Sequence, residues 1–131
     1  MRKAVIVVLA LPFLAMQCKN KNNCDRAICT EVLMSVSVNV TDKNGNNIDL
    51  QDHYTIKVAN GDTIRNNNGP WPEGAYVVLD DSYVNKMYNS RLQFRFVGIK
   101  NNIVVVDEPY TISADCCHIN KESGKETIVI D

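Results

Sequence analysis

The sequence predicts an all-β fold: a single antiparallel β-sandwich, Ig-like or prealbumin-like, with seven or eight strands and at most one short helix. Several short segments alternate apolar and polar residues, which is typical of strands with one buried face. Turn-forming residues separate these segments, and no long segment has the periodicity of a helix. The chain has 131 residues, and the predicted sandwich, residues 24–131, has the length of one domain.

The clearest strand covers residues 32–40, where apolar and polar side chains alternate. We expect one face of it to be buried and the other to meet solvent. The buried face would carry Met34, Val36, Val38 and Val40, and the other face Ser35, Ser37 and Asn39. Asn44-Gly45 follows as a turn, because both residues tolerate positive φ.

The remaining segments complete the sandwich. Residues 83–88 are expected to form one or two helical turns, with N-cap candidates at 80–82. Pro109 is expected to separate two strands, and residues 75–79 and 103–106 are apolar enough to be buried strands. The predicted strands after the first are residues 54–58, 63–65, 75–79, 92–98, 103–106, 110–112 and 127–130.

The N-terminus has the pattern of a secretory signal. Arg2 and Lys3 precede an apolar run of 12 residues, Ala4 to Ala15. A positive start followed by a short apolar core is typical of a signal peptide. As a helix the run would reach about 18 Å, too short for a hydrocarbon layer of about 30 Å. We therefore expect export rather than a permanent span.

Residues 14–18, Leu-Ala-Met-Gln-Cys, resemble the cleavage box of bacterial lipoproteins. The resemblance implies that residues 1–17 are removed and that Cys18 becomes an acylated N-terminus. A conventional signal peptidase would need a small residue at position 17, where the chain has glutamine. Residues 18–23 are polar and would form the lipidated N-terminus and a flexible tether.

Four cysteines remain for two disulfides: Cys24, Cys29, Cys116 and Cys117. Such bridges are typical of exported proteins, and each would close a long loop in the unfolded chain. If the two segments align antiparallel, Cys24 pairs with Cys117 and Cys29 with Cys116, which is the arrangement we favour. The other crossed pairing stays open, and so does a Cys24–Cys29 bridge beside a strained vicinal Cys116–Cys117 bridge.

Residues 115–118, Asp-Cys-Cys-His, form the densest cluster of chemically active side chains. The alternative function is therefore a small envelope metal-binding protein that uses Cys116, Cys117 and His118, because thiolate and imidazole suit zinc or copper. Adjacent residues of a strand point to opposite faces, however, so the two cysteines cannot easily bind one ion together. We predict disulfides, with no metal and no cofactor.

Trp71 is the best candidate for a ligand contact, because it lies between two prolines in a long loop. Its ring could stack on a sugar or on a partner protein, or it could cover an open end of the sandwich. The histidines, His53 and His118, are expected to be polar surface residues. The adjacent carboxylates are expected to face solvent or to cap a helix rather than form a glycosidase pair. These carboxylates are Asp80, Asp81, Asp107 and Glu108.

Two further observations narrow the function. The net charge is −1 and no basic cluster follows the tether, so nucleic-acid binding has no electrostatic support. No serine or cysteine lies in a Gly-x-Ser-x-Gly pattern or its cysteine equivalent. We therefore expect a protein that is not an enzyme.

Residues 36–45 are similar to the opening of transthyretin-like and carboxypeptidase-regulatory-like sandwiches, where a strand ends in Asp and turns at a Gly. Cys29-Thr30 and the late Asp-Cys-Cys-His at 115–118 resemble those of small lipoproteins of the Bacteroidota. Tyr110 and Ser123-Gly124 lie at similar places around that late motif. The resemblance implies a secreted sandwich and no known activity.

The sequence thus predicts a lipid-anchored, secreted β-sandwich for binding or assembly at the bacterial cell envelope, most simply at the outer membrane. The expected partners are the membrane, through the lipid at Cys18, and an envelope protein or a glycan.

Overall fold

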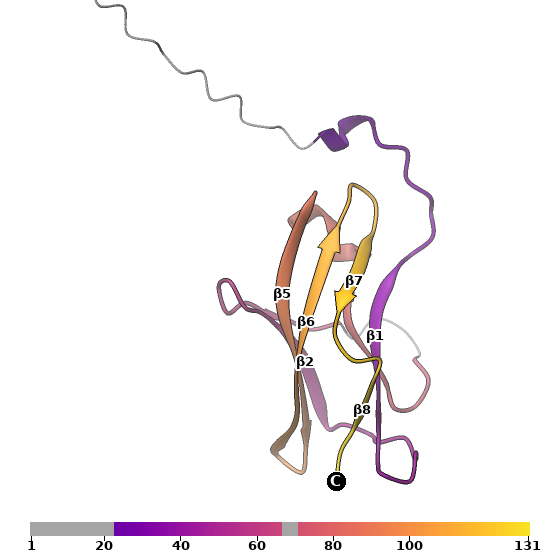
Figure 1. Ribbon diagram of the computed structural model, residues 1–131, viewed down its shortest axis with the longest axis vertical. Coiled ribbons are helices and arrows are strands. Elements are labelled where there is room, and N and C mark those ends of the chain that lie inside the picture. Colours follow the sequence, from indigo (N-terminus) through magenta and orange to yellow (C-terminus); the bar gives the residue numbers. More distant parts are fainter. Residues whose placement is uncertain (1–22, 67–70) are drawn as a thin grey trace, which may run out of the picture.

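The computed structural model describes residues 23–66 and 71–131, which form a sandwich of two β-sheets (Figure 1). The fold class predicted from the sequence is confirmed. Two short 3-10 helices accompany the strands, where at most one short helix was expected. The elements are η1 (Asn23–Arg26), β1 (Ser35–Thr41), β2 (Asp52–Lys57), β3 (Thr63–Ile64), β4 (Ala75–Asp80), η2 (Asp81–Lys86), β5 (Ser90–Lys100), β6 (Ile103–Ala114), β7 (Ile119–Ser123) and β8 (Thr127–Val129).

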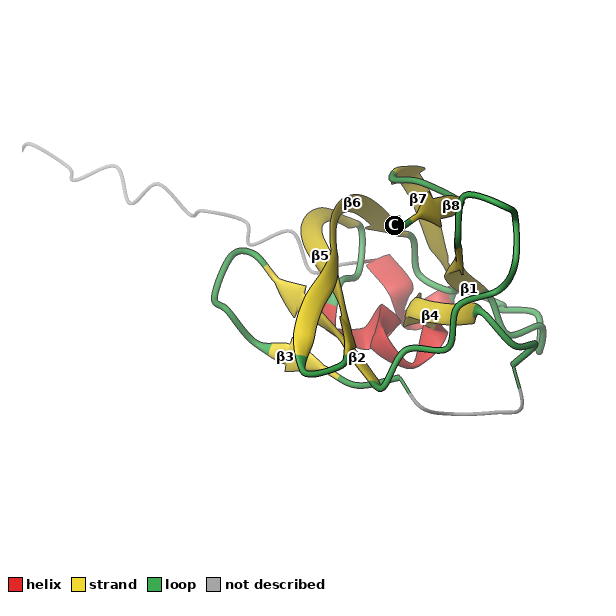
Figure 2. Ribbon diagram, turned by 90° about the horizontal axis from the view of Figure 1, so that it is seen from below, coloured by secondary structure: helices red, strands yellow, loops and turns green. Residues whose placement is uncertain are grey.

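One sheet has the strand order β4-β1-β8 and the other β3-β2-β5-β6-β7. Figure 2 shows the two layers from one end, with η2 at the far end between them. Most neighbouring strands are antiparallel, but β1 and β8 run parallel. The prediction of an antiparallel sandwich is therefore wrong for this pair, because the last segment of the chain enters the three-stranded sheet beside the first strand.

The last segment of the chain, residues 119–129, contributes one strand to each sheet. It pairs with β6 as β7, crosses at residues 124–126, and then pairs with β1 as β8. Gly124 at the crossing has φ +127, and a Cβ there would lie 2.1 Å from Cδ1 of Tyr110. The Tyr110 hydroxyl donates to the Lys125 carbonyl at 2.7 Å. Only glycine lets the main chain pass this close to the buried ring.

The core lies between the sheets and is built from their inward-facing side chains. On β1 the predicted alternation is confirmed for Val36, Val38 and Val40, which are buried. It is wrong for Met34, which is 42% exposed and lies before the strand begins at Ser35. η2 covers one end of the core with Tyr83 and Val84 (Figure 2). The largest fully buried side chains are Tyr110, Phe94, Phe96, Leu79, Met87, Ile112 and Ile119.

A bulge at Val78 in β4 connects the two layers. Val36 pairs with Leu79 and Ser37 with Val77, so Val78 is the extra residue. Its carbonyl accepts from Thr55 Oγ1 of β2 at 2.6 Å and from Asn66 Nδ2 at 3.1 Å. These buried donors satisfy an oxygen that the ladder between β1 and β4 leaves out.

The predicted break at Pro109 is wrong, because β6 runs unbroken from Ile103 to Ala114. β7 pairs with β6 only from Thr111 onward, so Pro109 has an unpaired edge on its other side among the described residues. A missing N–H removes no ladder hydrogen bond there. The expected burial of residues 103–106 is wrong at its start, since Ile103 is 65% and Val104 55% exposed.

Candidate functional site

Two disulfides fasten the segment before β1 to the turn between β6 and β7. Cys24 is bonded to Cys116 and Cys29 to Cys117, with Cα–Cα distances of 5.2 and 5.3 Å. The amide of Asn89 donates to the sulfurs of the first bridge, 3.6 Å from Cys24 and 3.8 Å from Cys116. The prediction that all four cysteines form two long-range disulfides is confirmed. We call residues 24–34 the arm.

The favoured pairing, Cys24–Cys117 with Cys29–Cys116, is wrong. It assumed that the arm and the β6–β7 turn run antiparallel. The arm instead passes the turn in the same direction, so Cys24, Cys29 and Thr30 meet residues 116, 117 and 118 in that order. Cys24 lies in η1. A 3-10 helix rises only about 2 Å per residue, so this turn shortens the distance along the chain between Cys24 and Cys29, whose partners are adjacent.

His118 links the arm to η2. Its Nδ1 lies 2.7 Å from Asp81 Oδ2, and its Nε2 lies 3.0 Å from Thr30 Oγ1. A carboxylate only accepts, so Nδ1 carries a proton, and the Nε2 of a neutral ring accepts from the Thr30 hydroxyl. The His118 side chain is 22% exposed, so it is partly buried, and it has a structural role beyond the polar surface residue that was expected.

Asp81 is the hub of these contacts. Besides the imidazole, its carboxylate accepts from the Met34 amide at 2.7 Å and from the Ile119 amide at 2.8 Å. Its own amide donates to the Met34 carbonyl at 3.0 Å. Its side chain is only 10% exposed. A single carboxylate therefore fixes the end of the arm, η2 and the start of β7 together.

Asp115 shapes the turn that carries the two cysteines. Its Oδ1 accepts from the main-chain amides of Cys117 at 2.6 Å and His118 at 2.8 Å. These two hydrogen bonds hold the pKa of Asp115 below its usual value. The ionised side chain thereby sets the direction in which Cys117 and His118 leave the turn.

Thr30, His118 and Asp81 stand in the order hydroxyl, imidazole and carboxylate, which is the order of a nucleophilic triad. Asp81, however, also binds two main-chain amides, and Thr30 follows directly on a disulfide. The groups therefore hold chain segments in place. We call Thr30, His118 and Asp81 the clamp.

The metal-binding alternative is contradicted. Both Cys116 and Cys117 are oxidised in disulfides, so neither offers a thiolate. Within residues 23–66 and 71–131, no group of three or more His, Cys, Asp or Glu side chains is arranged to hold a metal ion.

The other candidate residues are scattered over the fold. Trp71 is 40% exposed in the loop before β4, so its role as a ligand contact stays a prediction, and Cys18 lies outside the described residues. His53 packs against Tyr76 with 4.9 Å between ring centroids, and burial lowers its pKa, so this expected surface histidine is half-buried.

The adjacent carboxylates serve structure in three ways. Asp80 caps η2 through the Ser82 amide at 2.9 Å, and Asp81 belongs to the clamp. Asp107 forms an ion pair with Arg95 of β5. Glu108 forms an ion pair with Lys125 at 3.0 Å. The expectation that these groups face solvent or cap a helix is right for Asp80, which is a cap, and for Asp107, which is exposed. It is wrong for Asp81, whose side chain is only 10% exposed in the clamp.

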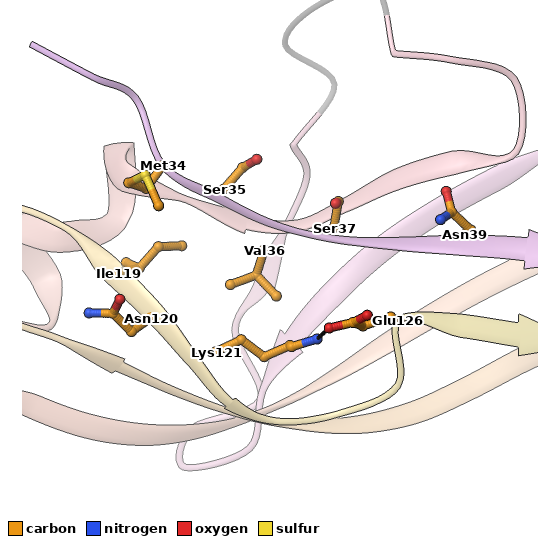
Figure 3. Close-up of a pocket in the computed structure, with 9 residues that line it drawn as sticks. All are labelled: Met34, Ser35, Val36, Ser37, Asn39, Ile119, Asn120, Lys121 and Glu126. Atoms are coloured by element: carbon orange, nitrogen blue, oxygen red, sulfur yellow. Dashed lines mark hydrogen bonds and ion pairs between the residues drawn. The ribbon is translucent and has the colours of Figure 1, made fainter.

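A groove of about 310 Å³ runs between β1 and β7 below the clamp (Figure 3). At one end Asp81 binds the amide of Met34, just before β1, and that of Ile119 in β7. At the other end the Asn39 amide donates to the Glu126 carbonyl at 2.9 Å. The Lys121–Glu126 ion pair lies on the β7 side of the groove and reaches toward this second end (Figure 3). The lining residues are Met34, Ser35, Val36, Ser37, Asn39, Ile119, Asn120, Lys121 and Glu126.

Main-chain groups of both strands face this groove. The Asn39 amide donates to Glu126 on the edge of β1 that faces β8. Peptide groups two residues apart on a strand point to the same edge. The main-chain groups of Ser35 and Ser37 therefore point to this edge as well. β8 covers this edge only from Asn39 to Thr41. On β7 the Ile119 amide points away from β6 toward Asp81. The main-chain groups of Lys121, two residues further along the strand, therefore face the groove. The groove thus presents peptide donors and acceptors on two sides.

Sequence reasoning missed both the clamp and the groove. The clamp had a usable signal, because Thr30 follows Cys29 and His118 follows Cys117, so the observed disulfide brings this pair together. The groove had none, because it arises where the last strand changes sheets.

Among the described residues, no helix is long and apolar enough to cross a bilayer. No protein-family model matches the chain, and neither a curated protein nor a solved structure matches it.

Proposed function

We propose that the chain is an exported, non-enzymatic binding or assembly module, anchored by a lipid on Cys18 at the bacterial cell envelope, on the outer membrane. Two disulfides support an oxidising location outside the cytoplasm. The signal pattern of residues 1–17 and the cysteine that follows it support the anchor. Two or three acyl chains on one residue bind a membrane stably, whereas a single chain does not.

The partner contacts the groove between β1 and β7 as a short extended peptide segment of an envelope protein. The observation that carries this is the open edge of β1 at Ser35 and Ser37, whose main-chain groups face the groove. Extended peptides bind such edges by main-chain hydrogen bonds. β7 faces this edge across the groove, so there is no room for the edge of a second folded sheet.

The binding part is tested with a photo-cross-linker at Asn120, an exposed residue that lines the groove, in intact cells. Ser37→Pro removes one N–H at the open edge and should reduce the cross-linked product at least about tenfold, as loss of a peptide hydrogen bond and its register predicts. Ser37→Ala keeps that N–H and is the matched control. The same cross-linker at Ala59, an exposed turn residue, is the positional control.

Equal products from the Pro and Ala variants, with both proteins folded, would contradict main-chain pairing in the groove. A product that forms equally at Ala59 would contradict the groove as the contact surface. Trp71→Ala in the same assay tests the loop contact, because a loss of product there as well would assign Trp71 to the same partner.

The anchoring part is tested by labelling cells with a radioactive fatty acid. We expect label in the wild-type chain and none in Cys18→Ser, which should leave the membrane fraction. Label-free wild-type protein that keeps residues 1–17 would refute the anchor.

A further inference from the structure

The arm exposes apolar side chains at a density found on no other described segment of comparable length. Four of its last seven residues are large and apolar, and none of them is buried in the sandwich. Water would normally drive such side chains into a core. The exposed fractions are 99% for Ile28, 63% for Val32, 68% for Leu33 and 42% for Met34.

Covalent and polar bonds keep the arm in this position. Its first part is bonded to the β6–β7 turn through Cys24 and Cys29. Thr30 bonds to His118, and Met34 exchanges main-chain hydrogen bonds with Asp81 at its end. The apolar side chains are therefore displayed from a fixed support rather than from a loose tail, which lowers the entropy lost when they are covered.

The chain before the arm indicates what covers it. Only residues 19–23 separate Cys18 from Cys24, and six residue steps span at most about 20 Å. The arm lies at the end of the sandwich where the chain enters the described fold (Figure 1). Acyl chains on Cys18 would hold this end of the molecule against the bilayer surface.

We propose that the arm docks on the lipid bilayer, with Ile28, Val32 and Leu33 in the interface between headgroups and acyl chains. This inference rests on the lipid anchor of the proposed function. Apolar side chains on a surface segment enter that interface to a depth of about 5–10 Å. The docked arm directs this end of the sandwich toward the membrane and the end with Val129 toward water.

The test places a single tryptophan reporter on the arm. Trp71→Phe supplies a background without tryptophan, because the chain has one, and Leu33→Trp adds the reporter at a 68% exposed position. The acylated protein is reconstituted into vesicles of phosphatidylethanolamine and phosphatidylglycerol that contain lipids brominated on the acyl chains. Val129→Trp in the same background, 59% exposed at the other end, is the matched control.

We expect a blue-shifted emission from the Leu33→Trp reporter and at least about a twofold loss of intensity with brominated lipid, since the ring enters the interface. The Val129→Trp control should show neither. Vesicles that float with their protein while the Leu33→Trp reporter stays unquenched would overturn arm docking and leave the anchor intact. Protein that does not float would overturn both proposals. A blue shift without lipid that grows with protein concentration would show that a second copy covers the arm, which also overturns membrane docking.

Discussion

The arm and the first strand of the sandwich are neighbours in sequence and both carry large apolar side chains, yet they are held in different ways. Val32, which is 63% exposed, lies only four residues before Val36, which is 5% exposed. β1 has a second sheet opposite its apolar face, whereas no sheet covers the arm, which is fixed by disulfides and the clamp. Apolar side chains in a sequence therefore indicate that a segment favours an apolar environment. Whether another part of the same protein covers those side chains depends on the topology of the fold.

The largest effect should come from the arm's disulfides, and it should not be additive. Both bridges close nearly the same loop, with sequence separations of 92 and 88. Removing the Cys24–Cys116 bridge alone opens only the short loop between the bridges and should cost about 2–3 kcal/mol in the chain-entropy model. Replacing all four cysteines by alanine should cost about 7 kcal/mol in total. Urea unfolding measures both free energies. If removing the Cys24–Cys116 bridge alone cost as much as removing both bridges, the two bridges would not close the same long loop.

A core truncation should separate the two regions next. Phe96 is fully buried between the sheets, so Phe96→Ala should lower the free energy of unfolding by about 3–5 kcal/mol. Val32→Ala on the arm should change the free energy of unfolding by less than about 0.5 kcal/mol, because the side chain is 63% exposed and lies outside the core. Denaturant unfolding of both variants tests the contrast. A comparable loss in the two variants would mean that the arm is part of the core.

The crossing between β7 and β8 should tolerate no side chain. Gly124→Ala combines a positive φ with a clash on the Tyr110 ring and should cost about 2–4 kcal/mol. Gly61→Ala is the matched control, because Gly61 also has positive φ but no atom within 4 Å of a Cβ, and should cost about 1 kcal/mol. Equal midpoints in thermal unfolding would show that the contact with Tyr110 is not tight.

The clamp should govern local rather than global stability. Asp81→Ala removes the acceptor of the Met34 and Ile119 amides, and loss of a charged acceptor costs about 1–3 kcal/mol. We expect faster hydrogen exchange at these two amides and unchanged exchange at Phe94. Uniformly faster exchange would instead place Asp81 among the groups that hold the whole sandwich together.

The smallest effect should be the pH response of the turn. The folded state lowers the pKa of Asp115 through the amides of Cys117 and His118. This stabilisation is present above the unfolded pKa of about 3.9 and is lost as the pH falls through the lower folded value. The difference in melting temperature between wild type and Asp115→Asn should therefore be present at pH 6 and shrink below pH 4. A difference that does not depend on pH would exclude this carboxylate as its source.

The strands with strict alternation could be predicted from the sequence alone. Val36, Val38 and Val40 indicated both a strand and its buried face, and Gly45 indicated the turn that follows. β7 could not be found, since its central residues are polar and only its pairing with β6 makes it a strand. The exposure of Ile103 also could not be found, because a local sequence does not tell which face is covered.

Less of the site than of the fold could be predicted from the sequence. The sequence supplied the four cysteines, but their pairing depends on the direction in which the arm passes the turn. That direction also decides that His118 meets Thr30, and thus whether the clamp exists. Long-range geometry of this kind leaves no trace in local periodicity.

The most direct test of this account is the disulfide pairing of the oxidised protein. Arg26 separates Cys24 from Cys29, so trypsin yields two peptides, residues 22–26 with Cys24 and residues 27–43 with Cys29, joined to one peptide that carries Cys116 and Cys117. Gas-phase fragmentation between these adjacent cysteines then assigns each arm peptide. The account predicts the Cys24 peptide on Cys116 and the Cys29 peptide on Cys117. The reverse assignment would contradict the course of the arm past the turn and the clamp that depends on it. Free thiols at these positions would also contradict the proposed oxidising location.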